Sequence, residues 1–92
     1  MEVYVVPMEL RDIEAVVELE KLSFSTPWSR EAFYSELLEN PLACYLVAKY
    51  AGKVIGYIGM WIIQDEAHIT NLAVHPQYRR QHVGKALLAM LI

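Results

Sequence analysis

The chain has 92 residues, which is enough for one small domain and too few for two. Apolar residues make up 55% of it and charged residues 21%, which excludes an intrinsically disordered chain and allows a hydrophobic core. The net charge of −3 argues against a nucleic-acid binder.

The cysteine count and the hydropathy pattern indicate where the protein works. The single cysteine, Cys44, excludes an internal disulfide framework, suggests a reducing compartment and has no obvious histidine partner that would make it a nucleophile. No apolar run approaches the roughly 20 residues needed to cross a bilayer. The N-terminus lacks a basic segment followed by a long apolar one, so we expect a cytoplasmic protein with no membrane partner. The three histidines do not have the spacing of a zinc site, so no metal is expected.

The N-terminal part of the chain predicts a strand followed by a helix. Residues 2–6 favour a strand, and Pro7 ends this run. Over residues 9–22 the apolar side chains recur at helical spacing on one stripe, with charged side chains mostly opposite. This pattern indicates a helix that packs on a core.

A second helix is predicted over residues 30–39. Ser29 is a favoured N-cap residue, and Trp28 and Phe33 have the spacing of a hydrophobic staple around it. The helix ends before Pro41, because a residue that precedes proline disfavours the helical conformation.

Three further strands are predicted at residues 43–50, 54–63 and 67–74. Gly52-Lys53 supplies the first hairpin turn, and residues 64–66 turn the chain into the last strand. The short turns make the three strands an antiparallel meander. Two glycines interrupt the middle strand, where we expect a bulge or a close backbone approach: Gly56 and Gly59.

The C-terminal part of the chain predicts a strand, a short turn and the start of a helix. Residues 69–74 are mostly apolar, and Pro76 stops the strand. An apolar run then fills residues 83–92, so a helix that begins near His82 would point its free N–H groups toward the end of the strand. Free N–H groups and the positive end of a helix dipole together form an anion site, which a diphosphate would fit.

The charges are distributed unevenly along the chain. Every Asp and Glu lies at or before Glu66, whereas Arg79, Arg80 and Lys85 lie after it. A locally basic segment in an acidic protein is what a small anionic ligand requires. A solvated helix start that is basic without binding anything explains the same charges, and the charges alone do not decide between the two.

This segment resembles the acetyl-CoA-binding motif of the GNAT N-acetyltransferases, which is Arg or Gln, two residues, Gly, one residue, then Gly or Ala. The motif falls on Arg79, His82 and Gly84, so His82 replaces the first glycine. The site then requires His82 to have a negative φ and to turn its ring to solvent. A second alignment on Gln81, Gly84 and Ala86 also matches, but its register is shifted by two residues and we prefer the first.

The resemblance covers nearly the whole chain and is closest to the ribosomal-protein alanine N-acetyltransferases. It rests on Phe24 with Pro27-Trp28-Ser29, on Asp65-Glu66-Ala67, on Asn71-Leu72-Ala73-Val74 and on Tyr78-Arg79-Arg80-Gln81. It implies an α+β fold in the order strand, two helices, three antiparallel strands and helix, which is the N-terminal half of the GNAT fold. The family continues with a fifth strand, a helix and two strands, and its Glu base and Tyr acid lie in that part. We therefore expect residues 1–92 to be a truncated GNAT domain without the C-terminal strands and the acceptor side.

The resemblance also implies acetyl-CoA as the co-substrate. Main-chain groups of Leu72, Ala73 and Val74 would bond the pantetheine arm and polarise the thioester carbonyl. Arg79 adds positive charge, and the diphosphate would be held by backbone amides along the helix start: Arg80, Gln81, His82, Val83, Gly84 and Lys85. Trp28 has two interpretations, because it either only pins the start of the second helix or also lines the acceptor cleft.

Within the chain, His68 is the residue that we expect to act as the base, with Glu66 as the other candidate near the site. By strand alternation, His68 should lie on the same face as Thr70, Leu72 and Val74. Histidine often serves as a general base. The alternative interpretation is that His68, as a lone histidine in a strand, has only a structural role.

The resemblance implies transfer of acetyl to the α-amino group of a ribosomal protein. The alternative is a non-catalytic CoA-binding or self-associating module, while a nucleotide-binding βα fragment is disfavoured because the preceding strands form a meander. We also expect a homodimer, because residues 67–74 leave one strand edge uncovered. The last helix would expose further apolar side chains: Leu87, Leu88, Leu91 or Ile92.

Overall fold

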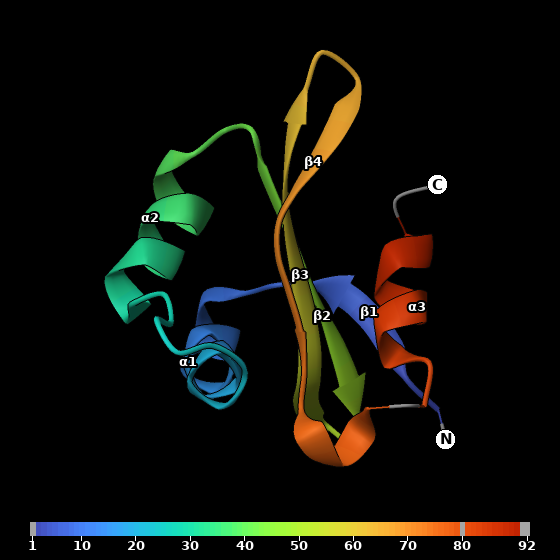
Figure 1. Cartoon of the computed structure of the whole chain (residues 1–92). Coiled ribbons are helices and arrows are strands. Elements are labelled where there is room, and N and C mark those ends of the chain that lie inside the picture. Colours follow the sequence, from blue (N-terminus) through green and yellow to red (C-terminus); the bar gives the residue numbers. More distant parts are fainter. Residues whose placement is uncertain (1, 80, 91–92) are drawn as a thin grey trace.

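The computed structural model describes residues 2–79 and 81–90. Its helices and strands are β1 (Tyr4–Pro7), α1 (Ile13–Ser23), α2 (Arg30–Glu39), β2 (Ala43–Tyr50), β3 (Lys53–Ile63), β4 (Glu66–Val74) and α3 (Val83–Ala89) (Figure 1). Short 3₁₀ turns at Leu10–Asp12 and Pro76–Tyr78 precede α1 and α3. The predicted order of elements and the α+β fold class are confirmed.

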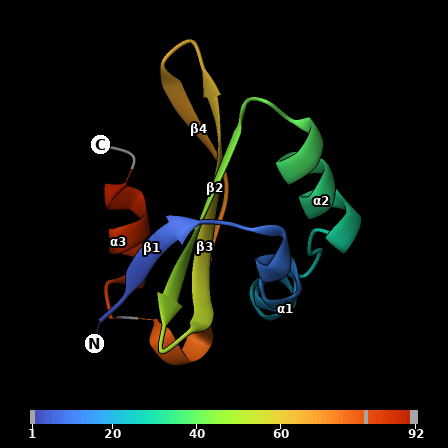
Figure 2. The ribbon, with the colours of Figure 1, turned by 180° about the vertical axis from the view of Figure 1, so that it is seen from behind.

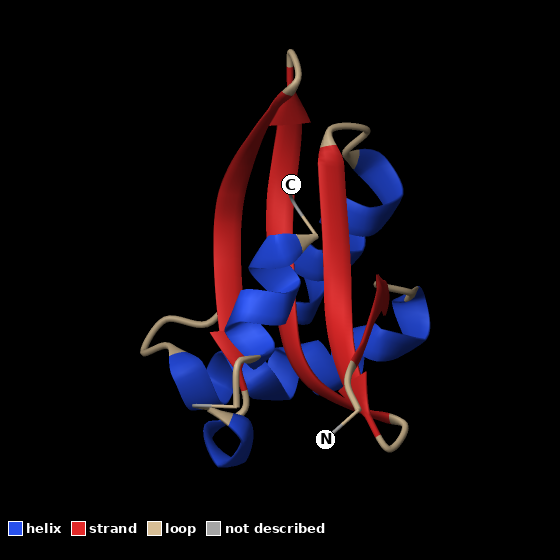
Figure 3. Ribbon diagram, turned by 90° about the vertical axis from the view of Figure 1, so that its right-hand side faces the viewer, coloured by secondary structure: helices blue, strands red, loops and turns tan. Residues whose placement is uncertain are grey.

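The four strands form one antiparallel sheet in the order β1-β2-β3-β4, which includes the predicted meander. Helices α1 and α2 cover one face of the sheet and α3 covers the other, as the view from behind also shows (Figure 2). Seen from the α3 side, the turn between β3 and β4 projects beyond the helices (Figure 3). None of the described helices is long and apolar enough to cross a membrane.

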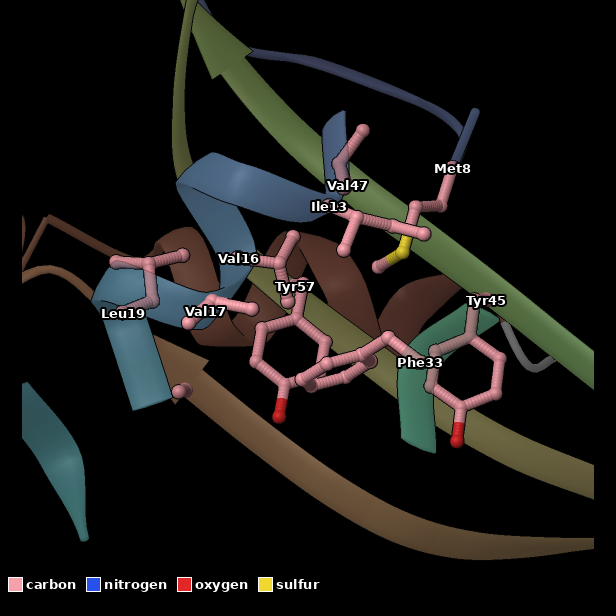
Figure 4. Close-up of a cluster of buried hydrophobic side chains, with 10 residues drawn as sticks. Met8, Ile13, Val16, Val17, Leu19, Phe33, Tyr45, Val47 and Tyr57 are labelled. Atoms are coloured by element: carbon pink, nitrogen blue, oxygen red, sulfur yellow. The ribbon is translucent and has the colours of Figure 1, made fainter. Parts of the chain in front are cut away.

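The core on the α1 and α2 face is built around aromatic rings. Phe33 of α2 lies edge-on to Tyr45 and Tyr57, with ring centroids 6.3 and 5.7 Å away. The apolar stripe of α1 packs beside these rings, and the whole buried cluster (Figure 4) comprises Met8, Ile13, Val16, Val17, Leu19, Phe33, Tyr45, Val47, Tyr57 and Ala73. Because each large buried side chain contributes about 1.5–3 kcal/mol, this cluster holds α1 and α2 firmly on the sheet.

Helix α3 packs on the opposite face through Val83 and Leu87, which are both buried. Gly56 allows this contact, because a Cβ there would lie 3.3 Å from Val83 Cγ1 and 3.4 Å from Leu87 Cδ1. The predicted close approach at this glycine is confirmed. Leu87 is therefore not among the exposed side chains of α3, whereas Leu88 is exposed; residues 91–92, which were also expected to be exposed, lie outside the described residues.

The predicted start of α2 is confirmed in detail. Ser29 Oγ accepts a hydrogen bond from the N–H of Ala32 at 3.2 Å, which is the N-cap contact. The rings of Trp28 and Phe33 lie 5.4 Å apart and form the hydrophobic staple. This staple fixes the last residues of the loop between α1 and α2 against the core.

Both hairpin turns use left-handed residues. Ala51 and Gly52 have φ values of 52° and 80°, and Gln64 and Asp65 have values of 48° and 68°. Two successive residues of this kind match the twist of the strands that they connect. The first turn is therefore Ala51-Gly52, and Lys53, which was predicted in the turn, already belongs to β3.

One residue of β4 has no partner in β3. Gly59 pairs with Asn71 and Met60 pairs with Ile69, which leaves Thr70 as a bulge. A Cβ on Gly59 would overlap the side-chain oxygen of Asn71, so the glycine makes room for that amide. The bulge predicted near Gly59 is confirmed, and the extra residue is on the neighbouring strand.

Candidate functional site

Strand β4 presents a free edge at which a ligand can bind. It pairs with β3 on one side, and no other described strand pairs with it. The N–H of His75 donates to the carbonyl of Ile55 at 2.7 Å, which sets the alternation of the hydrogen bonds between β3 and β4. By that alternation, the main-chain groups of Leu72 and Val74 point to the free edge, whereas those of Ala73 point to β3. Of the three residues predicted to bind the pantetheine arm, Leu72 and Val74 therefore have main-chain groups to offer.

A surface cavity of about 350 Å³, which we call the α3 cavity, lies between the end of β4 and the start of α3. It is lined by Tyr78 together with residues predicted to bind the cofactor: Val74, Arg79, His82, Val83, Gly84 and Lys85. Gln81 is exposed and does not line the cavity, and Arg80 lies outside the described residues. The first helical hydrogen bond runs from the N–H of Ala86 to the carbonyl of His82, so the amides between these two residues remain available for an anion.

The side chain of Arg79 ties three elements together. Its Nε donates to the carbonyl of Val74 at 3.0 Å, and its Nη2 lies 3.5 Å from Ser23 Oγ at the end of α1. The guanidinium thus occupies one acceptor position on the free edge of β4. A carbonyl oxygen has two lone pairs, so Val74 can still accept a second donor.

The backbone of His82 is left-handed, and the predicted negative φ is therefore wrong. Its φ is 63° and its ψ is 20°, at the N-cap position of α3. A left-handed residue costs roughly 1–2 kcal/mol for most residues and nothing for glycine, which gives a physical reason for a glycine at this position of the motif. Histidine is one of the residues that tolerate this region better than most. His82 is exposed, so its side chain can lie at the rim of the α3 cavity.

A second cavity of about 360 Å³, which we call the α1–α2 cavity, lies between the loop that joins these helices and β4. Its lining is Glu20, Phe24, Ser25, Thr26, Trp28, Thr70, Asn71 and Leu72. Trp28 therefore packs on Phe33 and also lines a cavity. Glu20 was not among the residues predicted for the site, although this residue continues the apolar stripe of α1 one turn after Val16, where a carboxylate is unusual.

Glu20 is a buried carboxylate that accepts two hydrogen bonds. It is 1% exposed, and its Oε1 accepts the N–H of Trp28 at 3.0 Å while its Oε2 accepts the hydroxyl of Tyr57. Burial of the phenol, reinforced by the neighbouring Glu20, raises the pKa of Tyr57 far above its usual value. Tyr57 thus keeps its proton and remains a hydrogen-bond donor.

A second carboxylate, Glu36, joins α2 to the sheet. It accepts hydrogen bonds from the hydroxyl of Tyr45 at 2.8 Å, from Trp61 Nε1 at 2.6 Å and from Asn40 Nδ2 at 2.9 Å. Burial acts to raise the pKa of Glu36, but the hydrogen bonds from Asn40, Trp61 and Tyr45 outweigh it and the pKa is lowered. Glu36 is therefore held as an anion that anchors the projecting β3–β4 arm to α2.

The bulge changes the face on which His68 lies. His68 pairs with Trp61, whose indole points to α2, so His68 lies on the α1 and α2 face. Leu72 and Val74 pack in the cluster under α3, on the opposite face. The prediction that His68 shares a face with Leu72 and Val74 is wrong, because simple alternation does not account for the extra residue Thr70.

His68 is not brought into either cavity. Its Nε2 lies 3.3 Å from Glu66 Oε2, and its side chain is 52% exposed. Cys44 is half-buried and packs in the cluster under α3. Within residues 2–79 and 81–90, no group of three His, Cys, Asp or Glu residues is placed to hold a metal ion.

Comparison with known proteins gives matches over most of the chain. Residues 13–92 match the Acetyltransferase (GNAT) family. The chain is 51% identical over 80 residues to a putative ribosomal protein bS18-alanine N-acetyltransferase of Bacillus subtilis, covering 87% of this chain and 53% of the relative. It is 35% identical over 85 residues to the ribosomal protein bS18-alanine N-acetyltransferase of Escherichia coli, covering 92% of this chain and 56% of the relative. The chain thus spans about half the length of these curated relatives.

Solved structures show the same fold. The crystal structure of the Escherichia coli ribosomal-protein alanine N-acetyltransferase matches with a TM-score of 0.87 and 29% identity, over 98% of this chain and 57% of that chain. The PaiA N-acetyltransferase of Thermoplasma acidophilum, solved in complex with coenzyme A, matches with a TM-score of 0.83 and 22% identity, over 98% of this chain and 69% of that chain. At that identity, the second likeness shows the fold alone.

The left-handed backbone of His82 yields a stability prediction. His82→Gly should raise the melting temperature by about 4 °C, because relief of the left-handed strain exceeds the flexibility that glycine adds to the unfolded chain. His75→Gly is the matched control: His75 has a φ of −53° and its Nδ1 accepts the N–H of Gln77, so this change should lower the melting temperature. Thermal unfolding followed by circular dichroism measures both, and a less stable His82→Gly variant would contradict the strain assigned to His82.

Proposed function

Because this chain belongs to the GNAT family of acetyltransferases, we propose that it takes part in the transfer of acetyl from acetyl-CoA to the α-amino group of an N-terminal alanine on a ribosomal protein. The observation that carries the proposal is the α3 cavity, where residues of the family's motif line a space at the end of the free edge of β4. The names of the relatives support alanine and a ribosomal protein as the acceptor. We place this activity in the cytoplasm, where ribosomal proteins are made.

The residues around the α3 cavity fit a diphosphate with an extended arm. The amides of Val83, Gly84 and Lys85 precede the helical hydrogen bonds of α3, and Lys85 adds an exposed positive charge. The main-chain groups of Leu72 and Val74 can pair with the amides of an extended ligand as a neighbouring strand would. When bound there, acetyl-CoA supplies a thioester as the acetyl donor.

The α1–α2 cavity is the proposed acceptor site. Phe24 and Trp28 give it an apolar wall, and Thr70 and Asn71 give it a polar one on β4. Leu72 lines this cavity and Val74 lines the α3 cavity, so both cavities lie along the same stretch of β4. An acceptor amine held in the α1–α2 cavity would therefore lie beside the free edge of β4, at which the acetyl donor binds.

The acceptor amine must lose a proton before it attacks, and His68 is the base that we propose among the described residues. It lies on the same face of β4 as the polar wall of the α1–α2 cavity, farther along the strand. The carboxylate of Glu66 lies 3.3 Å from its Nε2. Glu20, the acidic residue in the cavity lining, already accepts two hydrogen bonds and is less available as a base.

Acetyl-CoA binding is the first test of this function. Calorimetry should show binding by the folded chain, and Lys85→Ala should weaken it about three- to fivefold, since an exposed charge contributes up to about 1 kcal/mol. The loss should shrink at high salt, because screening weakens exposed charges. Lys53→Ala removes the same charge at an exposed position outside both cavities and should leave the dissociation constant unchanged. A folded chain that binds no acetyl-CoA would refute the proposal.

The transfer step can be tested by mass spectrometry with a peptide that begins with alanine. We expect slow acetylation of its α-amino group by this chain, because His68 lines neither cavity. His68→Ala should lower that rate at least about tenfold if the imidazole takes the proton, whereas His75→Ala, at the other end of β4, should not. Transfer that proceeds equally well in His68→Ala would show that another group acts as the base.

A second candidate function, a self-associating module, is favoured by the surface of the β3–β4 arm. The free edge of β4 lies beside exposed apolar side chains: Trp61, Ile62, Ile63 and Ile69. We propose that a second copy of the chain covers this arm, because two identical strand edges pair around a two-fold axis and cover each other.

Light scattering coupled to size exclusion measures the oligomeric state. The wild-type chain should run as a homodimer at micromolar concentration. Ile69→Lys should make it a monomer, because a lysine on an edge strand opposes pairing. Leu38→Lys makes the same kind of change at an exposed apolar residue of α2 and should leave the dimer intact. A monomeric wild-type chain would rule out the dimer.

A further inference from the structure

A chain of hydrogen bonds runs beneath the α1–α2 cavity and joins its two walls. It begins at the N–H of Trp28 in the loop, passes through the carboxylate of Glu20 and the hydroxyl of Tyr57, and ends at the amide of Asn71 on β4. Glu20 and Tyr57 are almost completely buried. The loop and β4 are therefore held in a fixed relation by buried polar groups from α1 and β3.

The direction of every hydrogen bond in this chain follows from the carboxylate. Glu20 can only accept, so Tyr57 must donate its proton to Glu20, and burial keeps that proton on the phenol. The oxygen of Tyr57 is then left to accept, and Asn71 Nδ2 donates to it at 2.6 Å. The Asn71 amide is thereby oriented with its nitrogen toward Tyr57, and its Oδ1 accepts the hydroxyl of Thr70 at 2.7 Å.

Packing confirms that the position of this amide is specific. Thr70 is the bulged residue of β4, so it and Asn71 both direct their side chains to the α1 and α2 face. The partner of Asn71 across the sheet is Gly59, and a Cβ at Gly59 would overlap Asn71 Oδ1 and the ring of Tyr45. Strand β3 thus has no side chain at the position that the side-chain amide of Asn71 occupies.

We propose that Asn71 is a positioning residue, oriented by Glu20 through Tyr57, that holds the Thr70 bulge in place and thereby directs the main-chain groups of Leu72 to the free edge of β4. This inference rests on the proposed function, because it assigns those groups of Leu72 to the binding of acetyl-CoA. Without the bulge, pairing of β4 would slip by one residue, and Leu72 would turn its main-chain groups toward β3.

Reversing the chain of hydrogen bonds tests this proposal. In Asn71→Asp, a carboxylate oxygen would face the oxygen of Tyr57, whose proton is already donated to Glu20, so neither oxygen has a proton to share. Adding Glu20→Gln should repair the defect, because the new amide keeps an oxygen for the N–H of Trp28 and donates to Tyr57, which can then donate to Asp at position 71. The double variant keeps the net charge of −3, since one acidic residue is lost and one is gained.

Thermal unfolding is the first readout. Asn71→Asp should lower the melting temperature by at least about 5 °C, because buried polar groups left without a proton between them are costly in a domain of this size. The double variant should recover most of that loss, even where Asn71→Asp alone does not fold. Asn40→Asp is the matched control: Asn40 Nδ2 donates to Glu36, so the same substitution should destabilise the chain, but Glu20→Gln should not repair it. A double variant no more stable than Asn71→Asp would overturn the proposal.

Acetyl-CoA binding and the NMR signal of the Leu72 amide are the second readout. In folded samples, Asn71→Asp should shift that amide resonance and weaken binding at least about tenfold, and the double variant should reverse both changes. Unchanged binding by a folded Asn71→Asp variant would overturn the positioning role. The failures are distinguishable: a wild-type chain that binds no acetyl-CoA refutes the proposed function, whereas a chain that binds acetyl-CoA but shows no repair in the double variant refutes the role of Asn71 alone.

Discussion

The pairing of β3 with β4 around one extra residue is the constraint on which the rest of the site depends. Before Thr70, the even-numbered residues of β4 face α1 and α2, whereas from Asn71 onward the odd-numbered residues face these helices. The strand can therefore place polar side chains on the face of α1 and α2 and, immediately afterwards, apolar side chains under α3. A regular strand of the same sequence would bury Thr70 beneath α3 or expose Leu72. The bulge gives this edge strand a polar wall for a cavity and an apolar base for a helix.

Specific residues on neighbouring elements make this irregularity stable. Gly59 leaves space on β3, and Tyr57 and Glu20 supply the hydrogen bonds that the Asn71 amide requires inside the protein. Burying an anion such as Glu20 is unfavourable unless it is hydrogen-bonded, and here both oxygens have a donor. None of the described buried side-chain nitrogen or oxygen atoms lacks a partner. The polar groups beneath the α1–α2 cavity therefore specify one arrangement of its walls.

The sequence allowed most of the fold to be predicted, because its signals are local. The N-cap at Ser29, the staple of Trp28 on Phe33 and the order of strands and helices all depend on residues near one another in the chain. The face of His68 could not be predicted, because the bulge that sets it results from packing between strands. The left-handed φ of His82 was missed for a related reason, since the side chain suggested an ordinary residue while the geometry of the turn decided otherwise.

One part of the candidate site could likewise be predicted from the sequence, and the other part could not. The residues that line the α3 cavity lie close together in sequence and most of them belong to a recognisable motif, so all of them except Tyr78 could be named in advance. The lining of the α1–α2 cavity comes from α1, the following loop and β4, and its key carboxylate, Glu20, was visible only as an acidic residue on an apolar stripe. Contacts between distant segments carry no short pattern, which is why the lining of the α1–α2 cavity was harder to predict than that of the α3 cavity.

The two cavities are held at a fixed separation by β4 itself. Leu72 lines one cavity and Val74 lines the other, and two residues along a strand span about 6.6 Å. Both residues direct their main-chain groups to the same edge, so a ligand that pairs with that edge passes from the α3 cavity to the α1–α2 cavity without leaving the strand. A bulge between Leu72 and Val74 would break this continuity, whereas a bulge at Thr70 leaves it intact and turns Asn71 into the adjoining cavity. The bulge at Thr70 lies two residues before Leu72, where the shared edge begins, and this position is what allows one strand to join the proposed donor site to the proposed acceptor site.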